Sequence, residues 1–227
     1  MKANTYLVIL TVTLFSSYSL FAQSEFSPTI IATWPGQELA DEEVLSELSE
    51  YNREIEITDE IRSNYAKESL AENWKIVRNK ELDYLQKQTF FSQISFLITT
   101  NLTYKIYEYH PNPLVYPVTD KLSVNRVEML NLAKKYAVDW VIDVVSVSAK
   151  KVEGEKIVEA RIILYNIVTN RTFLDKTYTK KPVNPGGQLE CEDGSWQCSL
   201  NSIVDEAVVD LFDQLEKNRR YWSTDGH

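Results

Sequence analysis

The stretch of sequence that decides the fold is residues 139–178, which read DWVIDVVSVSAKKVEGEKIVEARIILYNIVTNRTFLDKTY. Three segments in it are rich in β-branched and aromatic residues, the composition of strands that lie half-buried in a sheet. They are Trp140 to Val147, Ile157 to Ile167 and Thr172 to Tyr178. Two turns separate them, so the stretch predicts an antiparallel three-stranded meander.

The first turn fixes how the first two strands pair. Glu153-Gly154 reads as a two-residue turn in which Gly takes the positive φ that such turns need. Counting back from this turn pairs Val147 with Ala160 and Asp143 with Leu164. One face of the pair is then apolar apart from two polar residues, and it carries Val141, Asp143, Val145 and Val147 beside Ala160, Ile162, Leu164 and Asn166.

The start of the chain has the pattern of a secretory signal peptide over residues 1–22. Lys2 precedes a short apolar run, and a small-residue cleavage site follows at Leu20-Phe21-Ala22. The run is shorter than the ~20 residues of a membrane span, and no later stretch is long and apolar enough to form one. We therefore expect an exported protein, periplasmic or secreted from a Gram-negative-type bacterium, with a mature chain that begins near Gln23.

The charge balance restricts the partners. The formal net charge is -9, and the predicted signal contains Lys2 and no acidic residue, so its removal leaves -10. A chain of this charge repels phosphate backbones and anionic lipid, which argues against nucleic acid and the membrane surface as partners. An envelope protein is the partner that we expect, and no residue pattern predicts a cofactor.

We divide the remaining chain at residue 60. Residues 23–60 are predicted to hold an acidic strand and helix, and residues 61–222 a single domain, in line with the usual size of domains. The predicted fold class is α/β (α+β), with a mixed sheet whose C-terminal antiparallel three-strand meander packs against helices. Residues 180–199 are rich in Pro and Gly and are predicted to be an insertion in this domain.

The N-terminal segment begins with a strand candidate at Thr29 to Thr33. The chain is then strongly acidic from Glu38 to Glu60, with Leu45, Leu48 and Tyr51 at helical spacing. One interpretation is an amphipathic helix with a solvated acidic face. The other is a docking surface for a basic partner or for divalent cations, although the spacing of a calcium loop is absent.

The middle of the chain is mainly helical in its pattern. Thr58 caps a helix from Asp59 to about Asn73, and residues 74–88 continue with helical character. Residues 90–102 fit a helix or a strand, and we interpret them as a buried helix that leads into a strand at Tyr104 to Tyr109. The Pro-rich segment 110–119 is predicted to be an extended loop. Four tyrosines would then either pair across strands or stack on a sugar or peptide, namely Tyr104, Tyr107, Tyr109 and Tyr116.

Two further helices are predicted around the meander. One begins at Ser123 and ends at Val138, with an apolar stripe of Val127, Leu130, Ala133 and Ala137. The last helix begins near Asn201 or Ser202 and carries a clear apolar stripe from Ile203 to Leu215.

The insertion contains both cysteines of the chain, Cys191 and Cys198. In an exported protein such a close pair is most simply a disulfide. A metal site needs more ligands than His110 and His227 supply, and a redox-active pair usually has the spacing C-x-x-C. We therefore predict a structural disulfide and no metal site.

Trp196 lies between these cysteines, close to Glu192 and Asp193. An aromatic residue on a stapled loop loses little entropy when it docks, which is the property of an interface anchor. We therefore interpret Trp196, Glu192 and Asp193 as part of an interaction surface. The alternative is that Trp196 folds back as a lid on the sheet.

The C-terminal half resembles the α/β domains of bacterial envelope accessory proteins over residues 124–215. The resemblance lies in the run Leu132 to Val147, in the strand Ala160 to Asn166 and in the closing helix. Such domains occur in the N-terminal part of TolB, in the curli secretion lipoprotein family and in the lipoprotein activators of peptidoglycan synthases. Most of those families have Gly where Ala137 and Asp143 stand here. The resemblance implies protein–protein contact in the envelope and no catalytic residues.

Enzymatic chemistry has little support in the sequence. It contains no Gly-rich phosphate loop, no G-x-S-x-G elbow and no H-E-x-x-H helix. The alternative to an interaction protein is a secreted hydrolase that uses a carboxylate pair. Asp143 is the candidate acid, because apolar neighbours on a strand would raise its pKa, and the other interpretation is a structural Asp at the sheet end, paired with a backbone group or a Lys.

Overall fold

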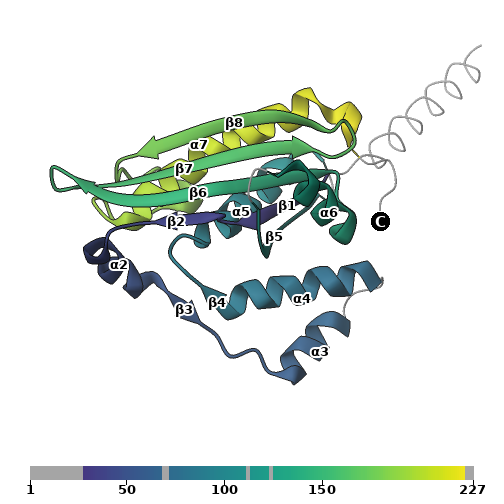
Figure 1. Cartoon of the computed structure of the whole chain (residues 1–227), viewed down its shortest axis with the longest axis horizontal. Coiled ribbons are helices and arrows are strands. Elements are labelled where there is room, and N and C mark those ends of the chain that lie inside the picture. The colour runs from purple at the N-terminus through teal and green to yellow at the C-terminus, as the bar shows by residue number, and fades with distance from the viewer. Residues whose placement is uncertain (1–27, 68–71, 111–112, 123–124, 223–227) are drawn as a thin grey trace, which may run out of the picture.

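The structure, a computed structural model, describes residues 28–67, 72–110, 113–122 and 125–222. The predicted signal peptide lies outside them. A mixed sheet has the strand order β5-β1-β6-β7-β8, and β2 pairs with β6 further along that strand (Figure 1). Its strands are β1 (Thr29–Trp34), β2 (Gln37–Leu39), β5 (Leu114–Lys121), β6 (Trp140–Val152), β7 (Glu155–Asn166) and β8 (Arg171–Lys180).

Helices complete the fold, and they confirm the predicted class of a mixed sheet with a C-terminal meander packed against helices. A second, two-stranded sheet consists of β3 (Arg53–Glu54) and β4 (Lys87–Gln88). The α-helices are α2 (Glu42–Leu48), α3 (Asp59–Lys67), α4 (Glu72–Gln86), α5 (Gln93–Tyr107), α6 (Arg126–Tyr136) and α7 (Trp196–Lys217). In the part of the chain described, no helix is long and apolar enough to cross a membrane.

The meander is formed by β6, β7 and β8, but part of the predicted register is wrong. Near the turn Val147 pairs with Ala160 as expected. The register then shifts between Val144 and Ser146, because β6 has one extra residue, Val145, at a β-bulge. The sequence does not show which residue is extra, because Val144 and Val145 are both apolar.

The bulge also changes which residues share a face of the sheet. Asp143 pairs with Ile163 and not with Leu164. Val144 and Val147 are three positions apart, yet both lie in the same buried cluster. The extra residue between them shifts the alternation of faces by one position, so both side chains lie on the same face of the sheet. The predicted face that joined Asp143 to Val147 is therefore wrong.

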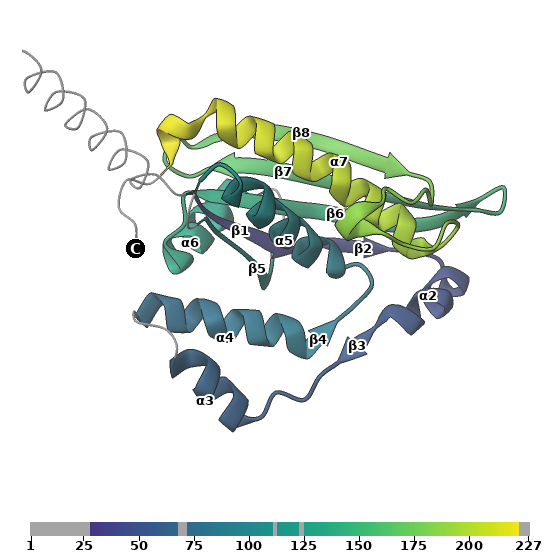
Figure 2. The ribbon, with the colours of Figure 1, turned by 180° about the vertical axis from the view of Figure 1, so that it is seen from behind.

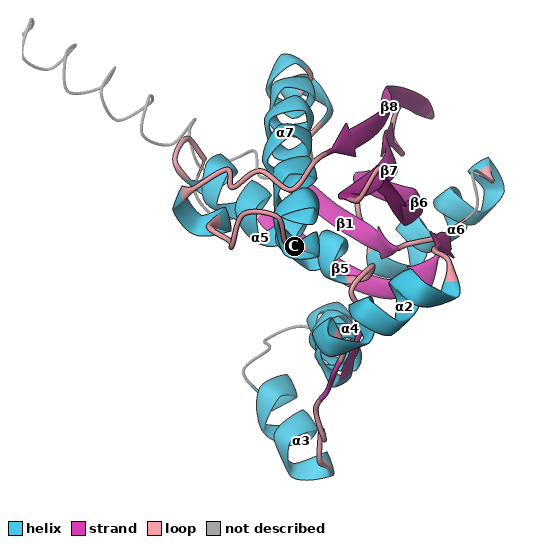
Figure 3. Ribbon diagram, turned by 90° about the vertical axis from the view of Figure 1, so that its left-hand side faces the viewer, coloured by secondary structure: helices cyan, strands magenta, loops and turns pink. Residues whose placement is uncertain are grey.

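Helices cover both faces of the sheet. In the edge-on view α5 and α7 lie on one side and α6 on the other (Figure 3). The larger core lies under α5 and α7, which run side by side (Figure 2). A smaller core lies under α6 and contains Met129, Leu132, Ala133 and Tyr136. Helix α4 lies beside the edge strand β5.

Strand β1 lies inside the sheet, where it pairs in parallel with β5 on one side and β6 on the other. Its residues Ile30, Ile31 and Ala32 have no exposed surface. The division at residue 60 therefore has no counterpart in the sheet, because a strand from before it forms part of the core of the following domain.

Two predictions for residues 104–119 are wrong. Tyr104 to Tyr107 form the last turn of α5 and not a strand, so the helix simply continues. The predicted loop is largely strand β5, whose Pro117 is tolerated because β5 is an edge strand. β5 pairs with β1, more than 80 positions earlier in the chain, and a parallel partner so distant leaves no local pattern.

The acidic N-terminal segment forms short helices. Its first helix is only α2, which is followed by a 3-10 turn at Ser49–Tyr51. Thr58 caps α3 as predicted, because its hydroxyl accepts a hydrogen bond from the backbone N–H of Ile61 at 3.3 Å. Glu43 and Glu47 both pair with Lys151 of β6, so α2 is tied to the meander by charge.

Helix α6 begins later than predicted, with Asn125 as its cap. Its buried stripe includes Met129 and Leu132, whereas Val127 is exposed. The predicted stripe is therefore rotated around the helix. Ala137 ends the helix in the left-handed conformation at φ 50, which Gly adopts more easily.

Candidate functional site

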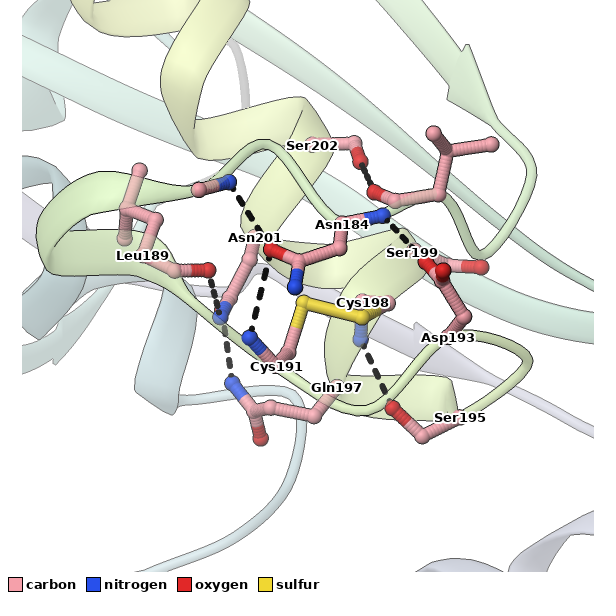
Figure 4. Close-up of a disulfide and its surroundings, with 12 residues drawn as sticks. Asn184, Leu189, Cys191, Asp193, Ser195, Gln197, Cys198, Ser199, Asn201 and Ser202 are labelled. Carbon is pink, nitrogen blue, oxygen red and sulfur yellow. Dashed lines mark hydrogen bonds between the residues drawn. A yellow bond between two sulfur atoms is a disulfide. The ribbon is translucent and has the colours of Figure 1, made fainter.

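Residues 181–195 leave the sheet after β8 and return along α7. They contain a 3-10 turn, Gly187–Leu189, and Cys191, which forms a disulfide with Cys198 whose Cα atoms are 5.4 Å apart (Figure 4). Cys198 already belongs to α7, because that helix begins at Trp196 and not at Asn201 or Ser202. The disulfide therefore ties the insertion to the first turn of the last helix.

Side chains of α7 also hold the insertion in place. The amide nitrogen of Asn201 donates to the carbonyl oxygen of Leu189 at 2.9 Å, and the Ser202 hydroxyl donates to that of Val183 at 2.6 Å (Figure 4). These bonds satisfy backbone groups that secondary structure leaves unpaired. These contacts hold residues 181–195 in place beside α7, and we call this segment the wall.

This wall and helices α5 and α7 enclose a first hollow of about 300 Å³. Helix α5 and its C-cap residue Glu108 contribute residues at positions i, i+3, i+4 and i+7, which form one stripe along the helix. The hollow is lined by Asn101, Tyr104, Lys105, Glu108, Gly186, Gly187, Gln188, Leu189, Asp205, Val208 and Val209.

A second hollow of about 640 Å³ lies on the β8 side of α7. Asp205 and Val209 line both hollows, so the outer stripe of α7 is the ridge between them. The second hollow is lined by Thr179, Lys180, Lys181, Val183, Pro185, Ser202, Asp205, Glu206, Val209 and Asp210. We call the outer stripes of α5 and α7, with residues 181–189, the α5–α7 face.

Two of the three carboxylates of the second hollow, Glu206 and Asp210, are paired with lysines. Lys176 binds Glu206 at 2.7 Å and Asp210 at 2.8 Å, and Lys180 binds Glu206 at 2.5 Å. Hydrogen bonds from the two lysines hold the pKa of Glu206 below its usual range. A general acid needs a raised pKa, so Glu206 is poorly suited to that role.

Three exposed tyrosines lie at the C-terminal end of α5, and one of them, Tyr104, lines the first hollow. Tyr104, Tyr107 and Tyr109 are 56%, 64% and 65% exposed at the end of α5. The ring of Tyr109 lies 5.5 Å from that of Phe212 on α7. The fourth tyrosine of the predicted cluster, Tyr116, is buried in the smaller core. The three exposed tyrosines therefore neither form a core nor pair across strands. Extending the helical periodicity of α5 to residue 107 would have indicated that these side chains are exposed.

Trp196 is not available as an interface anchor, because its side chain is fully buried. Its indole N–H donates to Glu47 of α2 at 3.0 Å, and the ring belongs to the larger core. Of the two interpretations of Trp196, the structure agrees with burial against the sheet. Glu192 and Asp193 are exposed, and Asp193 accepts a hydrogen bond from the backbone N–H of Asn184 at 2.8 Å.

Asp143 lies apart from both hollows, on the sheet face opposite to α5 and α7. It has no exposed surface, and the Thr33 hydroxyl donates to its Oδ1 at 3.3 Å. Its Oδ2 accepts no hydrogen bond from the described residues. Burial raises the pKa of Asp143 to about 6, although the bond from Thr33 opposes the rise. The expected pairing with a backbone group or a Lys is not what the structure has.

His110, the internal histidine, is also buried. Its Nε2 lies 2.8 Å from Glu216 of α7, and Arg219 donates to its Nδ1 at 3.3 Å. These contacts join the end of α5 to the end of α7. Across the described ranges, no three His, Cys, Asp or Glu side chains are arranged to hold a metal ion.

No protein family and no curated protein matches this chain in sequence. A PelC dodecamer from Paraburkholderia phytofirmans has a TM-score of 0.38 and 9% identity, over 82% of this chain and 87% of that chain. A hypothetical protein from Chlamydia trachomatis has a TM-score of 0.39 and 9% identity, over 85% of this chain and 100% of that one. A protein from Xanthomonas campestris has a TM-score of 0.38 and 6% identity, over 88% of this chain and 92% of that one. Likenesses this distant say nothing about the function of the chain.

Proposed function

We propose that this chain is an exported, non-enzymatic protein that binds a protein partner of the cell envelope through the α5–α7 face. One observation carries the proposal: Tyr104, Tyr107 and Tyr109 expose more than half of their surface at the end of α5, where Tyr104 also lines the first hollow. Tyrosine is enriched among the residues that dominate binding energy at protein interfaces. Three of them on one helix end form a surface suited to a protein partner.

The cellular setting draws on separate arguments. The signal-peptide pattern of residues 1–22 and the Cys191–Cys198 disulfide support export, because disulfides persist in oxidising compartments. The resemblance of residues 124–215 to envelope accessory domains supports an envelope partner. A hydrolase with a carboxylate pair has less support, since Glu206 in the second hollow is ion-paired and Asp143 lies on the other side of the sheet.

Site-specific photo-crosslinking tests the proposal. A benzoylphenylalanine at position 107 is expected to crosslink the full chain to one envelope protein in intact cells. The matched control is the same group at Val127, which is 64% exposed but lies on α6, on the opposite face. Tyr104→Ala should abolish the adduct at unchanged melting temperature, because an exposed side chain contributes little to stability. Equal labelling from both positions, or none from position 107, would refute the proposal.

A further inference from the structure

The two hollows are close enough for one partner segment to reach both. Asp205 and Val209 of α7 line each of them, so a single helix separates the hollows. A helix with its side chains is about 10–12 Å across. A chain in the extended polyproline II conformation advances about 3.1 Å per residue and has three residues per turn. Side chains three residues apart therefore lie on the same side of the chain, about 9 Å apart, and would enter the two hollows.

The first hollow has the chemistry of a site for a cation. Its charged residues are Glu108, Asp205 and Lys105, which sum to -1. Neither Glu108 nor Asp205 has an ion-pair partner within the described parts of the chain. The Lys105 ammonium lies 5.4 Å from the centre of the Phe212 ring. The exposed ring of Tyr104 adds an aromatic face, which attracts Lys and Arg side chains.

The second hollow is different in character. Its exposed apolar wall is Val183, Pro185 and Val209, and Val183 is 64% exposed. Two of its three carboxylates, Glu206 and Asp210, are held by Lys176 and Lys180, and the third is Asp205 of the ridge. An aliphatic side chain would bury this wall without displacing an ion pair, whereas a basic side chain would have to compete with two lysines.

We propose that an extended segment of the partner crosses the Asp205–Val209 ridge, with a basic side chain in the first hollow and an aliphatic side chain, about three residues away, in the second. The inference rests on the proposed function, because it names the chemistry of the same partner. The insertion is the wall of both hollows, and its disulfide and hydrogen bonds hold that wall before the partner arrives, which lowers the entropy lost on binding.

Short peptides test whether binding requires both a basic and an aliphatic side chain. The mature protein is titrated with the acetylated amides Arg-Ser-Ser-Leu, Glu-Ser-Ser-Leu and Arg-Ser-Ser-Ser, and backbone amide shifts are followed by NMR at low salt. The first peptide is expected to shift amides of α5, α7 and residues 183–189, and to bind at least about fivefold more tightly than either of the others, a ratio typical of one lost contact at an exposed site.

Variants assign each contact. Glu108→Gln should weaken the arginine peptides about threefold, the size of one exposed charge contact, and Val183→Ser should remove the preference for Leu. Glu190→Gln is the matched control, because this exposed acid of the insertion lines neither hollow and should change nothing.

The outcomes separate the two proposals. Equal binding of the arginine and glutamate peptides, or no shifts in the hollows, would overturn the inference, whatever the crosslinking gives. The inference would also be overturned if triacetylchitotriose shifted the backbone amide signals of residues that line the first hollow and the peptides did not. A missing crosslink from position 107 would instead count against the proposed function itself.

Discussion

At the level of single residues, Asp143 carries an energetic cost that can be measured. Its pKa of about 6, against an ordinary 3.8, means that the folded state holds the proton more tightly than the unfolded state. Folding stability therefore falls as the pH rises from about 4 to about 6, and the loss is complete above that range. The difference corresponds to about 3 kcal/mol.

Asp143→Asn should remove this cost, because the amide keeps the shape of the protonated acid. We expect the variant to be more stable than the natural chain by up to about 3 kcal/mol at pH 7.5, and nearly equal to it at pH 3.5. Urea denaturation at the two pH values measures the difference. Asp175→Asn is the control, since the hydrogen bond from Arg161 lowers the pKa of Asp175 and predicts the opposite sign. A variant no more stable at pH 7.5 would contradict the account.

At the level of elements, the connection between β1 and β2 depends on Gly36. A Cβ added there would lie 2.4 Å from the carbonyl oxygen of Leu122 and 2.8 Å from that of Val145. Both atoms belong to backbone, at the end of β5 and at the bulge of β6, so neither can move aside cheaply. The Gly36 N–H also donates to Val144 at 2.9 Å, which fixes the close approach.

Gly36→Ala is therefore expected to lower the unfolding free energy by about 2 kcal/mol or more, the cost of overpacking a rigid site. The control is Gly154→Ala in the turn between β6 and β7, where nothing lies within 4 Å and only the positive φ of 84 is strained. That strain costs about 1 kcal/mol. Chemical denaturation of both variants measures the loss of unfolding free energy in each. A smaller loss for Gly36→Ala than for Gly154→Ala would disprove the expectation.

Elements with local partners were predictable from the sequence, and those with distant partners were not. The meander β6–β7–β8 follows from its composition and its turns, because each strand pairs with its neighbour in the chain. Strand β5 was interpreted as a loop because its partner β1 lies far away. The segment Tyr104 to Tyr109 imitates a strand for a different reason: it is rich in aromatic and β-branched residues, while the helix before it continues to Tyr107.

The candidate site was predictable only in part. The insertion and its cysteine pair stand out in the sequence, but the burial of Trp196 depends on α7 beginning five residues early and on Glu47 from α2. The hollows are made by α5, α7 and the insertion together. Three segments so far apart in the sequence leave no common pattern in it.

At the level of the whole molecule, long-range contacts join segments that are far apart in the sequence. Glu47 of α2 accepts the hydrogen bond of Trp196 and pairs with Lys151 at the tip of the meander. At the other end of α7, Glu216 meets His110 after α5. The core is thus built mainly from the sheet, α5 and α7, and the insertion contributes Leu189 to it while it shapes the α5–α7 face.

Removing the disulfide separates these two roles. The double variant Cys191→Ala, Cys198→Ala opens a ring of eight residues and should cost about 2.5 kcal/mol on the chain-entropy account. The sheet does not depend on it, so hydrogen exchange of β6 to β8 should change little. Amides of residues 186–189 should exchange faster, and the partner crosslink from position 107 should weaken, because the covalent link to α7 is lost and the hydrogen bonds of Asn201 and Ser202 remain. If exchange quickened equally in the sheet, the disulfide would be a support of the core, and the insertion would not be the separate binding wall described above.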